Sequence, residues 1–330
     1  MPALPDRSSR GGLGRVVLAG VALLLMAPVG VFAAPGPALL ASAGLIALPL
    51  ASLSLVAPPR RPLALFVAGA SVLITFWWLL GRGELPDQTI RATAVLATGG
   101  FLILGLATRW AFTPRALAAT GGAAALVIAL YALFGRSWDA LHWWSEYRAG
   151  FAMRLRFAPL WGGGPGAGDP LFRDLGDAIG TAVRVMSDLF PALLALHLMA
   201  AFAVATALHR RLAGRAVGKP PGPFRSFRFS DHLGWLMVVP LIVVLVTKVA
   251  AAKLAAWNLL TLMSALYVVR GLAVAAFGMQ LLGGGLLVAV LAGLAIVFML
   301  PVVLGVALLL GVIDGGLDLR RRWTASRKTE

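Results

Sequence analysis

Long apolar runs constrain this chain more than any other feature of its sequence. Residues 14–34, 63–81 and 257–281 are nearly unbroken stretches of aliphatic, aromatic and small side chains. A helix of roughly 20 apolar residues crosses a bilayer core about 30 Å thick. Because 60% of the residues are hydrophobic and only 13% are charged, about half the share in soluble domains, the sequence predicts an all-α integral membrane protein.

Charged breaks and Gly/Pro clusters divide the apolar sequence into predicted spans. These spans are 14–34, 38–57, 63–81, 92–108, 116–135, 177–208, 233–252, 257–281 and 285–313. We expect a polytopic transmembrane helical bundle of about eight or nine spans. Its predicted parts are a five-span N-terminal bundle at 1–135, an extracytoplasmic loop at 136–176, and a C-terminal bundle at 177–330 with a basic loop at 209–231.

The predicted extracytoplasmic loop contains an amphipathic segment. Trp138, Leu141 and Trp144 recur at helical spacing, with Asp139 and Glu146 interrupting them. Such a helix, rich in tryptophan on its apolar side, is suited to lie in the membrane interface. Two interpretations remain open: a lid over an outward cavity, or a loop that rests on the membrane.

The basic residues predict the orientation of the chain. The formal net charge is +16, and the cations stand between apolar runs rather than in a stripe with interleaved aromatics, so we expect no nucleic-acid partner. Four basic segments fall on one side: the N-terminus, the Arg60-Arg61 loop, the Arg109–Arg115 loop and the 209–231 loop. The positive-inside rule makes that side cytoplasmic, in contact with anionic headgroups. The sequence thus predicts a multi-pass bacterial inner-membrane protein with a cytoplasmic N-terminus.

The C-terminal tail conflicts with this simple count of spans. Three predicted spans separate the 209–231 loop from the basic tail Arg320–Arg322, so both cannot be cytoplasmic. Either one late segment fails to cross, or the tail is external. Pro301 and the glycines at 283–285 mark the last segment as the one most prone to bend. The first apolar run also resembles a signal peptide. Whether it is cleaved or is retained as the first span, it places the residues that follow Ala34 outside the cytoplasm.

Residue types that carry catalysis or bind metals are scarce. The chain has no cysteine, four scattered histidines, no glycine-rich phosphate loop and no nucleophile elbow. Paired acids and bases suited to proton transfer are also missing. We therefore expect no enzyme activity, no cofactor and no metal site.

Ionisable groups within apolar runs are the better guide to function, since each is costly in hydrocarbon. Arg270 lies roughly 17 Å from either end of its predicted span, counting about 1.5 Å per residue. Asp188 is the carboxylate most comparably placed, and Arg184 shares its helix face four residues away. Arg270, Asp188, Arg184 and Asn258 are thus candidates for ligand binding or for buried ion pairing. Either Arg270 holds an anionic ligand, or it pairs with Asp188 or with carbonyl groups to pack helices.

Other charges have simpler explanations. Asp314 and Asp318 stand four residues apart just before Arg320, which predicts an interfacial helix end with local salt bridges. Lys248 and Lys253 lie near the outer end of their predicted span, where long side chains reach headgroups.

The C-terminal half carries a family resemblance over about residues 177–322. A long helix leads to a basic, proline-rich loop that runs from Pro220-Pro221-Gly222-Pro223 to Ser230-Asp231, and then to a Trp-bearing span. Asn258-Leu259-Leu260, Arg270-Gly271-Leu272-Ala273 and the ending Leu310 to Arg322 complete the pattern. This resembles the YybS-like family of bacterial membrane proteins, which implies no established activity. The family pattern has Gln where this chain has Arg270.

The N-terminal bundle of that family is similar to the substrate-binding subunits of energy-coupling-factor transporters. Those subunits contact a membrane partner through Ala-x-x-x-Ala in the first helix; here Met26 follows Ala22, and only Ala43 and Ala47 fit the spacing. The resemblance implies a protein that binds or translocates a small solute, with a membrane partner subunit. The alternative is a non-catalytic membrane scaffold or assembly factor that uses the 209–231 loop to hold a partner.

Overall fold

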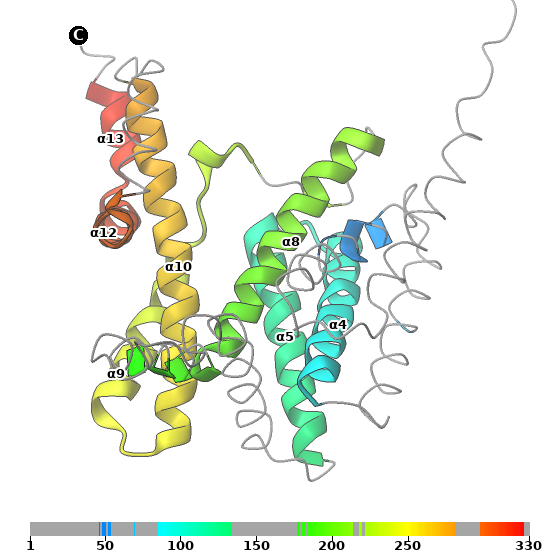
Figure 1. Ribbon diagram of the computed structural model, residues 1–330. Helices are drawn as coiled ribbons and strands as arrows, with labels where there is room; N and C mark the ends of the chain where they lie inside the picture. The colour runs from blue at the N-terminus through cyan, green and yellow to red at the C-terminus, as the bar shows by residue number, and fades with distance from the viewer. Residues whose placement is uncertain are drawn as a thin grey trace, which may run out of the picture. The chain divides into compact units, whose positions relative to one another are not determined.

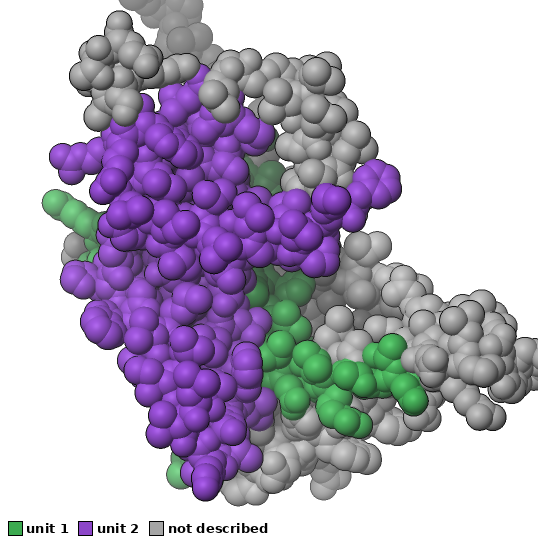
Figure 2. Space-filling view, turned by 90° about the vertical axis from the view of Figure 1, so that its left-hand side faces the viewer, with its two compact units in different colours: residues 1–220 green, residues 221–330 purple. Residues whose placement is uncertain are grey.

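The structure, a computed structural model, describes residues 85–133, 187–213, 218–219, 222–281 and 298–326, with single residues between 46 and 69 and between 177 and 185. Its regular elements in these ranges are all helical. The chain forms two compact units, Met1–Pro220 and Pro221–Glu330, coloured separately in Figure 2. The predicted amphipathic segment at 138–157 and most of the first three predicted spans lie outside the described residues.

The division between the units differs from the expected domain plan. It falls inside the predicted 209–231 loop, whereas the sequence analysis placed residues 177–330 in one C-terminal bundle. Helix α8, Phe190–Ala213, packs on α5 and α4 in the first unit. The composition favours a boundary in the loop, because domain boundaries fall in polar, proline-rich segments and residues 209–231 are rich in both arginine and proline.

The first unit is built around α4, Leu85–Ala107, α5, Phe112–Leu133, and α8. Helices α4 and α5 lie side by side, and α8 runs obliquely across them (Figure 1). Each of the three helices has a proline in its first turn. A backbone N–H there would have no acceptor within the helix, so proline, which lacks this group, costs no hydrogen bond. The Phe101 ring of α4 stacks on the Phe202 ring of α8, with 4.5 Å between ring centroids. The Phe101 ring also makes an edge-to-face contact with the Phe112 ring of α5.

The second unit is organised by the long helix α10, Ala250–Leu281 (Figure 1). Two short 3-10 helices, Phe224–Ser226 and Asp231–Gly234, precede α9, Trp235–Val246, which packs against α10. Helix α12, Leu300–Leu317, is viewed almost along its axis beside α10, so the two cross steeply, and α13, Leu319–Ser326, follows it.

Glycines allow α10 and α12 to touch backbone to backbone. A Cβ atom added at Gly271 would lie 1.7 Å from the carbonyl oxygen of Ala307, and one at Gly311 would lie 2.0 Å from that of Tyr267. Small residues replace the hydrophobic drive between helices in lipid, because only close contact distinguishes a neighbouring helix from lipid tails. This crossing is the tightest packing of the second unit that we find among the described glycines.

Four helices of the described residues are long and apolar enough to cross a membrane. They are Phe112–Leu133, Phe190–Arg211, Ala250–Leu281 and Leu300–Leu317, with shorter apolar helices at Ala92–Ala107 and Asp231–Val246. These four support a helical membrane protein. The finer expectation of eight or nine spans is not decided by them.

Two predicted spans are interrupted in the structure. The run at 233–252 is divided because Thr247 is extended, and α9 therefore ends at Val246 after 12 residues. At about 1.5 Å per residue, α9 is roughly 18 Å long, less than the bilayer core. The run at 285–313 does not continue as one described helix, since α12 begins at Leu300 with Pro301 in its first turn.

Candidate functional site

A buried ion pair joins α10 to the end of α12 in the second unit. The Nε of Arg270 donates to Oδ2 of Asp314 at 2.9 Å, and its Nη2 donates to the carbonyl oxygen of Asp314 at 3.0 Å. The exposed fractions of the two side chains are 1% and 0%. Because a buried charge without a partner is very costly, this bidentate contact accounts for a charge deep in an apolar helix.

Arg320 shares the same carboxylate and ties it to the preceding loop. Its Nη2 donates to Oδ2 of Asp314 at 2.8 Å, while its Nη1 donates to the carbonyl oxygens of Arg225 and Phe227 at 3.0 and 3.1 Å. Asp314 therefore connects α10, the first turn of α13 and residues 225–227. The sequence analysis expected only local salt bridges at this helix end, and the structure corrects that to a long-range junction.

Asp231 and two aromatic rings complete the surroundings of Arg270. The Nη1 of Arg270 donates to Oδ1 of Asp231 at 3.0 Å, although the Asp231 side chain is 68% exposed. The guanidinium carbon lies 5.2 Å from the centroid of the Phe229 ring, which in turn meets Tyr267 edge-on. Each of the three guanidinium nitrogens thus has an acceptor within the protein, which supports the ion-pairing interpretation of Arg270.

A second, more exposed pair lies at the turn between α12 and α13. The Nη2 of Arg228 lies 2.6 Å from Oδ1 of Asp318. Asp318 ends α12 in the left-handed conformation with φ of 47°, which Asp and Asn tolerate better than most residues. The hydrogen bond from Arg228 lowers the pKa of Asp318, and that same bond raises the pKa of Arg228.

The other predicted site residues lie elsewhere in the chain. The described partners of Arg270 are Asp314 and Asp231 of its own unit, whereas Asp188 belongs to the first unit, so the pairing of Arg270 with Asp188 stays a prediction. Arg184 is exposed. Asn258 donates from its side chain to the carbonyl oxygen of Leu254, one turn back in α10. The sequence placed Arg270 correctly inside a helix but not its neighbours.

Distance along the chain explains why Asp314 was missed. It stands 44 positions from Arg270, at the end of a different helix, and the sequence pattern around it fits a surface helix end. One signal was available: Gly311, Gly315 and Gly316 make that turn of the helix small enough for close approach.

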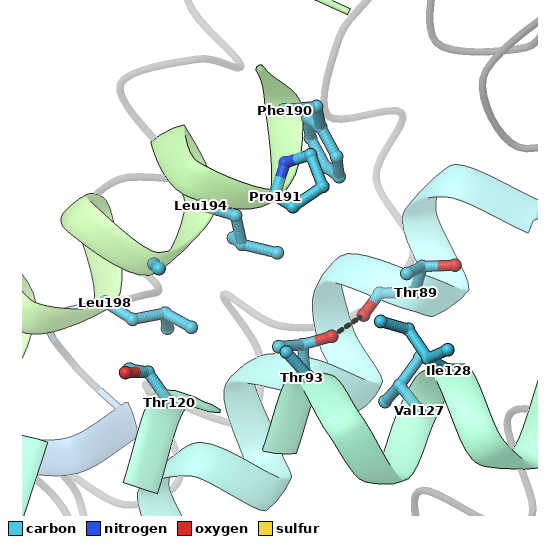
Figure 3. Close-up of a pocket in the computed structure, with 11 residues that line it drawn as sticks. Thr89, Thr93, Thr120, Val127, Ile128, Phe190, Pro191, Leu194 and Leu198 are labelled. Atoms are coloured by element: carbon cyan, nitrogen blue, oxygen red, sulfur yellow. Dashed lines mark hydrogen bonds between the residues drawn. The ribbon is translucent and has the colours of Figure 1, made fainter. Parts of the chain in front are cut away.

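The first unit contains a pocket between its three helices. It holds about 440 Å³ of empty space, including its open mouth, and Figure 3 shows side chains from α4, α5 and α8 around it. Its lining residues are Thr89, Thr93, Thr120, Ala124, Val127, Ile128, Phe190, Pro191, Leu194, Ala195 and Leu198.

The threonines of the pocket do not make it strongly polar. The hydroxyl of Thr93 donates to the carbonyl oxygen of Thr89 at 2.7 Å, and that of Thr120 to the carbonyl oxygen of Ala116 at 2.8 Å. The hydroxyls of Thr89 and Tyr131 bond to each other. Because the protons of Thr93 and Thr120 are already engaged in the protein, the walls offer mostly apolar surface and a few oxygen lone pairs.

Basic residues gather at the other end of the first unit. Arg115, in the first turn of α5, lies with its guanidinium carbon 4.1 Å from the centroid of Phe101. Gly218, with φ of +72°, lies so close that an added Cβ would be 1.8 Å from Nη1 of Arg115. Residues of the Arg109–Arg115 loop and of the 209–231 loop therefore share one end of the unit, while the pocket lies toward the start of α4 and α8.

No described group of three or more His, Cys, Asp or Glu residues could hold a metal ion. Several apolar helices of spanning length define a multi-pass helical membrane protein, with a buried ion pair in one unit and a pocket between helices in the other. The chain belongs to the family described as "Predicted membrane protein (DUF2232)", whose model matches residues 17–315. The resemblance to YybS-like membrane proteins is thereby confirmed. No curated protein and no solved structure matches the chain.

Proposed function

We propose that the first unit binds a small, largely apolar solute in the pocket between α4, α5 and α8. The carrying observation is the pocket itself, which opens between three packed helices and has mostly apolar walls, as ligand sites commonly do. Aliphatic walls favour an apolar body, and the oxygen lone pairs of Thr93 and Thr120 favour one hydroxyl or N–H group on it.

The position of the pocket supports entry from the outer side. Arg115 and Gly218 belong to the two loops that the positive-inside rule assigns to the cytoplasm. The pocket lies at the opposite end of the unit. The proposed role is thus capture of a solute from the outer side of a bacterial inner membrane. Translocation with a membrane partner subunit, as in the energy-coupling-factor transporters, is an extension of the same proposal.

The proposed role is non-catalytic. The lining residues of the pocket are apolar or threonine, with no acid, base or nucleophile paired for proton transfer among them. A binding function needs only shape and a few hydrogen bonds, which these residues supply.

A tryptophan that fills the pocket tests this proposal. Ala195 lines the pocket, whereas Ala200 is exposed on the same helix, so Ala195→Trp and Ala200→Trp form a matched pair. Thermal unfolding of the full chain in detergent would be followed with benzene, indole, 1-naphthol and geraniol as probes. We expect at least one probe to stabilise the wild type and Ala200→Trp but not Ala195→Trp, by up to about 2.7 kcal/mol at a hundredfold excess over Kd. Equal shifts in all three proteins, or none in any, would oppose a binding pocket.

A scaffold function is the second candidate, and one observation favours it. Asp314 fixes residues 225–227, α10 and α13 to each other through buried bonds, so the second unit holds its basic loop in a set position. A rigid support of this kind suits a protein that presents a surface to a partner. Pocket-filling variants would leave such a function intact, which separates the two candidates.

A further inference from the structure

We propose that the second unit carries a binding surface for anionic lipid headgroups. The surface, called here the headgroup surface, consists of Phe224, Arg225 and Arg228 of the loop and Arg321, Arg322 and Trp323 of α13. This inference is independent of the pocket in the first unit. It names a partner for the second unit, namely the phosphate groups of the leaflet in which α12 ends.

Charge is the first argument. Around the junction, the described residues include six arginines and three aspartates: Arg225, Arg228, Arg270, Arg320, Arg321 and Arg322 against Asp231, Asp314 and Asp318. The carboxylates lie beside Arg270, Arg320 and Arg228. A positive excess therefore remains on the headgroup surface, at Arg225 and Arg321 among others, where a phosphate would complement it.

Arg225 shows how this excess is presented. Its Nη1 donates to Oε1 of Gln280 at 2.6 Å, so a neutral amide orients the guanidinium without cancelling its charge. Within the described part of the chain, neither Arg225 nor Arg321 forms an ion pair with a carboxylate. The backbone of Arg321 and Arg322 is held by the carbonyl oxygen of Asp318.

Depth in the membrane is the second argument. Helix α12 exposes large apolar side chains along its length, which suits contact with lipid tails: Val302, Leu304, Val306, Leu309, Val312, Ile313 and Leu317. The arginines of α13 follow within one turn of its end. Phe224 is 52% exposed and Trp323 38% exposed beside them, and aromatic residues of this kind favour the interface between tails and headgroups.

The buried ion pairs give the surface a fixed shape. Arg320 bonds the carbonyl oxygens of Arg225 and Phe227, which holds the loop against α13, and the Trp323 ring lies against Gly278 of α10. Loop and helix therefore present their cations together. A preorganised cluster loses less conformational freedom when a headgroup binds than separate flexible chains would.

Lipid selectivity of the full chain tests the inference. The protein would be reconstituted in phosphatidylcholine vesicles, and the association of spin-labelled phosphatidylglycerol would be compared with that of spin-labelled phosphatidylcholine. We expect the wild type to prefer phosphatidylglycerol and the pair Arg321→Gln with Arg322→Gln to reduce that preference. A cation near the surface contributes about 1 kcal/mol, which sets an upper limit of about fivefold for each arginine.

Matched variants guard against general effects of charge or folding. Lys248→Gln with Lys253→Gln removes the same charge near the opposite end of α10, where the two lysines reach headgroups separately, and should lower the preference less than the glutamine pair at 321 and 322, while Arg321→Lys with Arg322→Lys should retain most of it. The inference is overturned if the glutamine pair at 321 and 322 keeps the wild-type preference, or if either control pair loses as much. Unchanged lipid preference with loss of a co-purifying protein would point to a protein partner instead.

Discussion

Arg270 and Asp314 form an ion pair across 44 positions of sequence, with 2.9 Å between Nε and Oδ2 and both side chains excluded from solvent. The pair fastens the long helix α10 to the end of α12. Arg320 adds a second cation to the same carboxylate. A single aspartate thus pairs with two buried or nearly buried arginines, and Asp231 supplies the second negative charge, at Arg270.

Removal of this carboxylate should be the most damaging single change in the second unit. Asp314→Ala leaves Arg270 and Arg320 without their shared partner, and breaking a buried ion pair costs about 3–5 kcal/mol. We expect a large fall in the unfolding temperature, measured by circular dichroism in detergent. Asp188→Ala is the control, since it removes a carboxylate of the first unit and keeps the described partners of Arg270, and it should leave this junction intact. Equal stability of Asp314→Ala and the wild type would contradict the structural role.

Contact between α10 and α12 depends on one glycine in each helix. Gly271→Ala places a Cβ about where the Ala307 carbonyl oxygen lies, so the helices must move apart and lose packing worth about 1–3 kcal/mol or more. Gly305 faces open space on α12, and Gly305→Ala should stabilise the protein slightly through helix propensity. Chemical or thermal unfolding of both variants compares them. A similar effect of the two alanines would argue against the close crossing.

The exposed pair of Arg228 and Asp318 predicts a dependence of stability on pH. Because the hydrogen bond from Arg228 lowers the pKa of Asp318 in the folded state, its contribution is complete above the ordinary pKa of about 3.9 and disappears as the pH falls through the lower folded value. Asp318→Asn keeps a residue that tolerates positive φ, so it removes the charge with little backbone strain.

Unfolding temperatures of the wild type and Asp318→Asn should therefore differ at pH 7 and converge below about pH 4. The difference should be small, at most about 1 kcal/mol, since both side chains are partly exposed. Arg228→Gln should abolish it. A constant difference from pH 7 to pH 3 would show that the charge of Asp318 is not responsible.

Contacts between the loop and the tail decide a question of topology. Arg320 bonds carbonyl oxygens of residues 225 and 227, so the loop and the basic tail lie on the same face. Because the chain has no native cysteine, Phe224→Cys, Arg322→Cys and Lys248→Cys can each be labelled singly with a membrane-impermeant maleimide. We expect labelling of Lys248→Cys in intact cells, and of the other two only in inverted vesicles. Opposite sides for Phe224→Cys and Arg322→Cys would contradict this arrangement.

The contact between the loop and the tail bears on the conflict in the count of spans. The predicted spans at 233–252 and 285–313 were both taken as single crossings, but α9 ends at Val246 and α12 begins only at Leu300. Apolar runs report length and composition, whereas an extended residue such as Thr247 or a proline in a first turn decides where each helix begins and ends. The basic loops, by contrast, could be grouped from sequence, and Arg115 with Gly218 lie at one end of the first unit.

Sequence alone determined the class of this protein, its family and the importance of Arg270. Apolar length and the cost of a buried charge are local properties, because bilayer thickness and desolvation act on each segment by itself. Tertiary structure alone decided that Asp314 and Asp231 are the partners of Arg270, that α8 belongs with α4 and α5, and that these three helices enclose a pocket. Those facts depend on which helix surfaces contact each other. Small residues such as Gly271 and Gly311 would allow many close helix–helix contacts, and only the tertiary packing decides which of them forms.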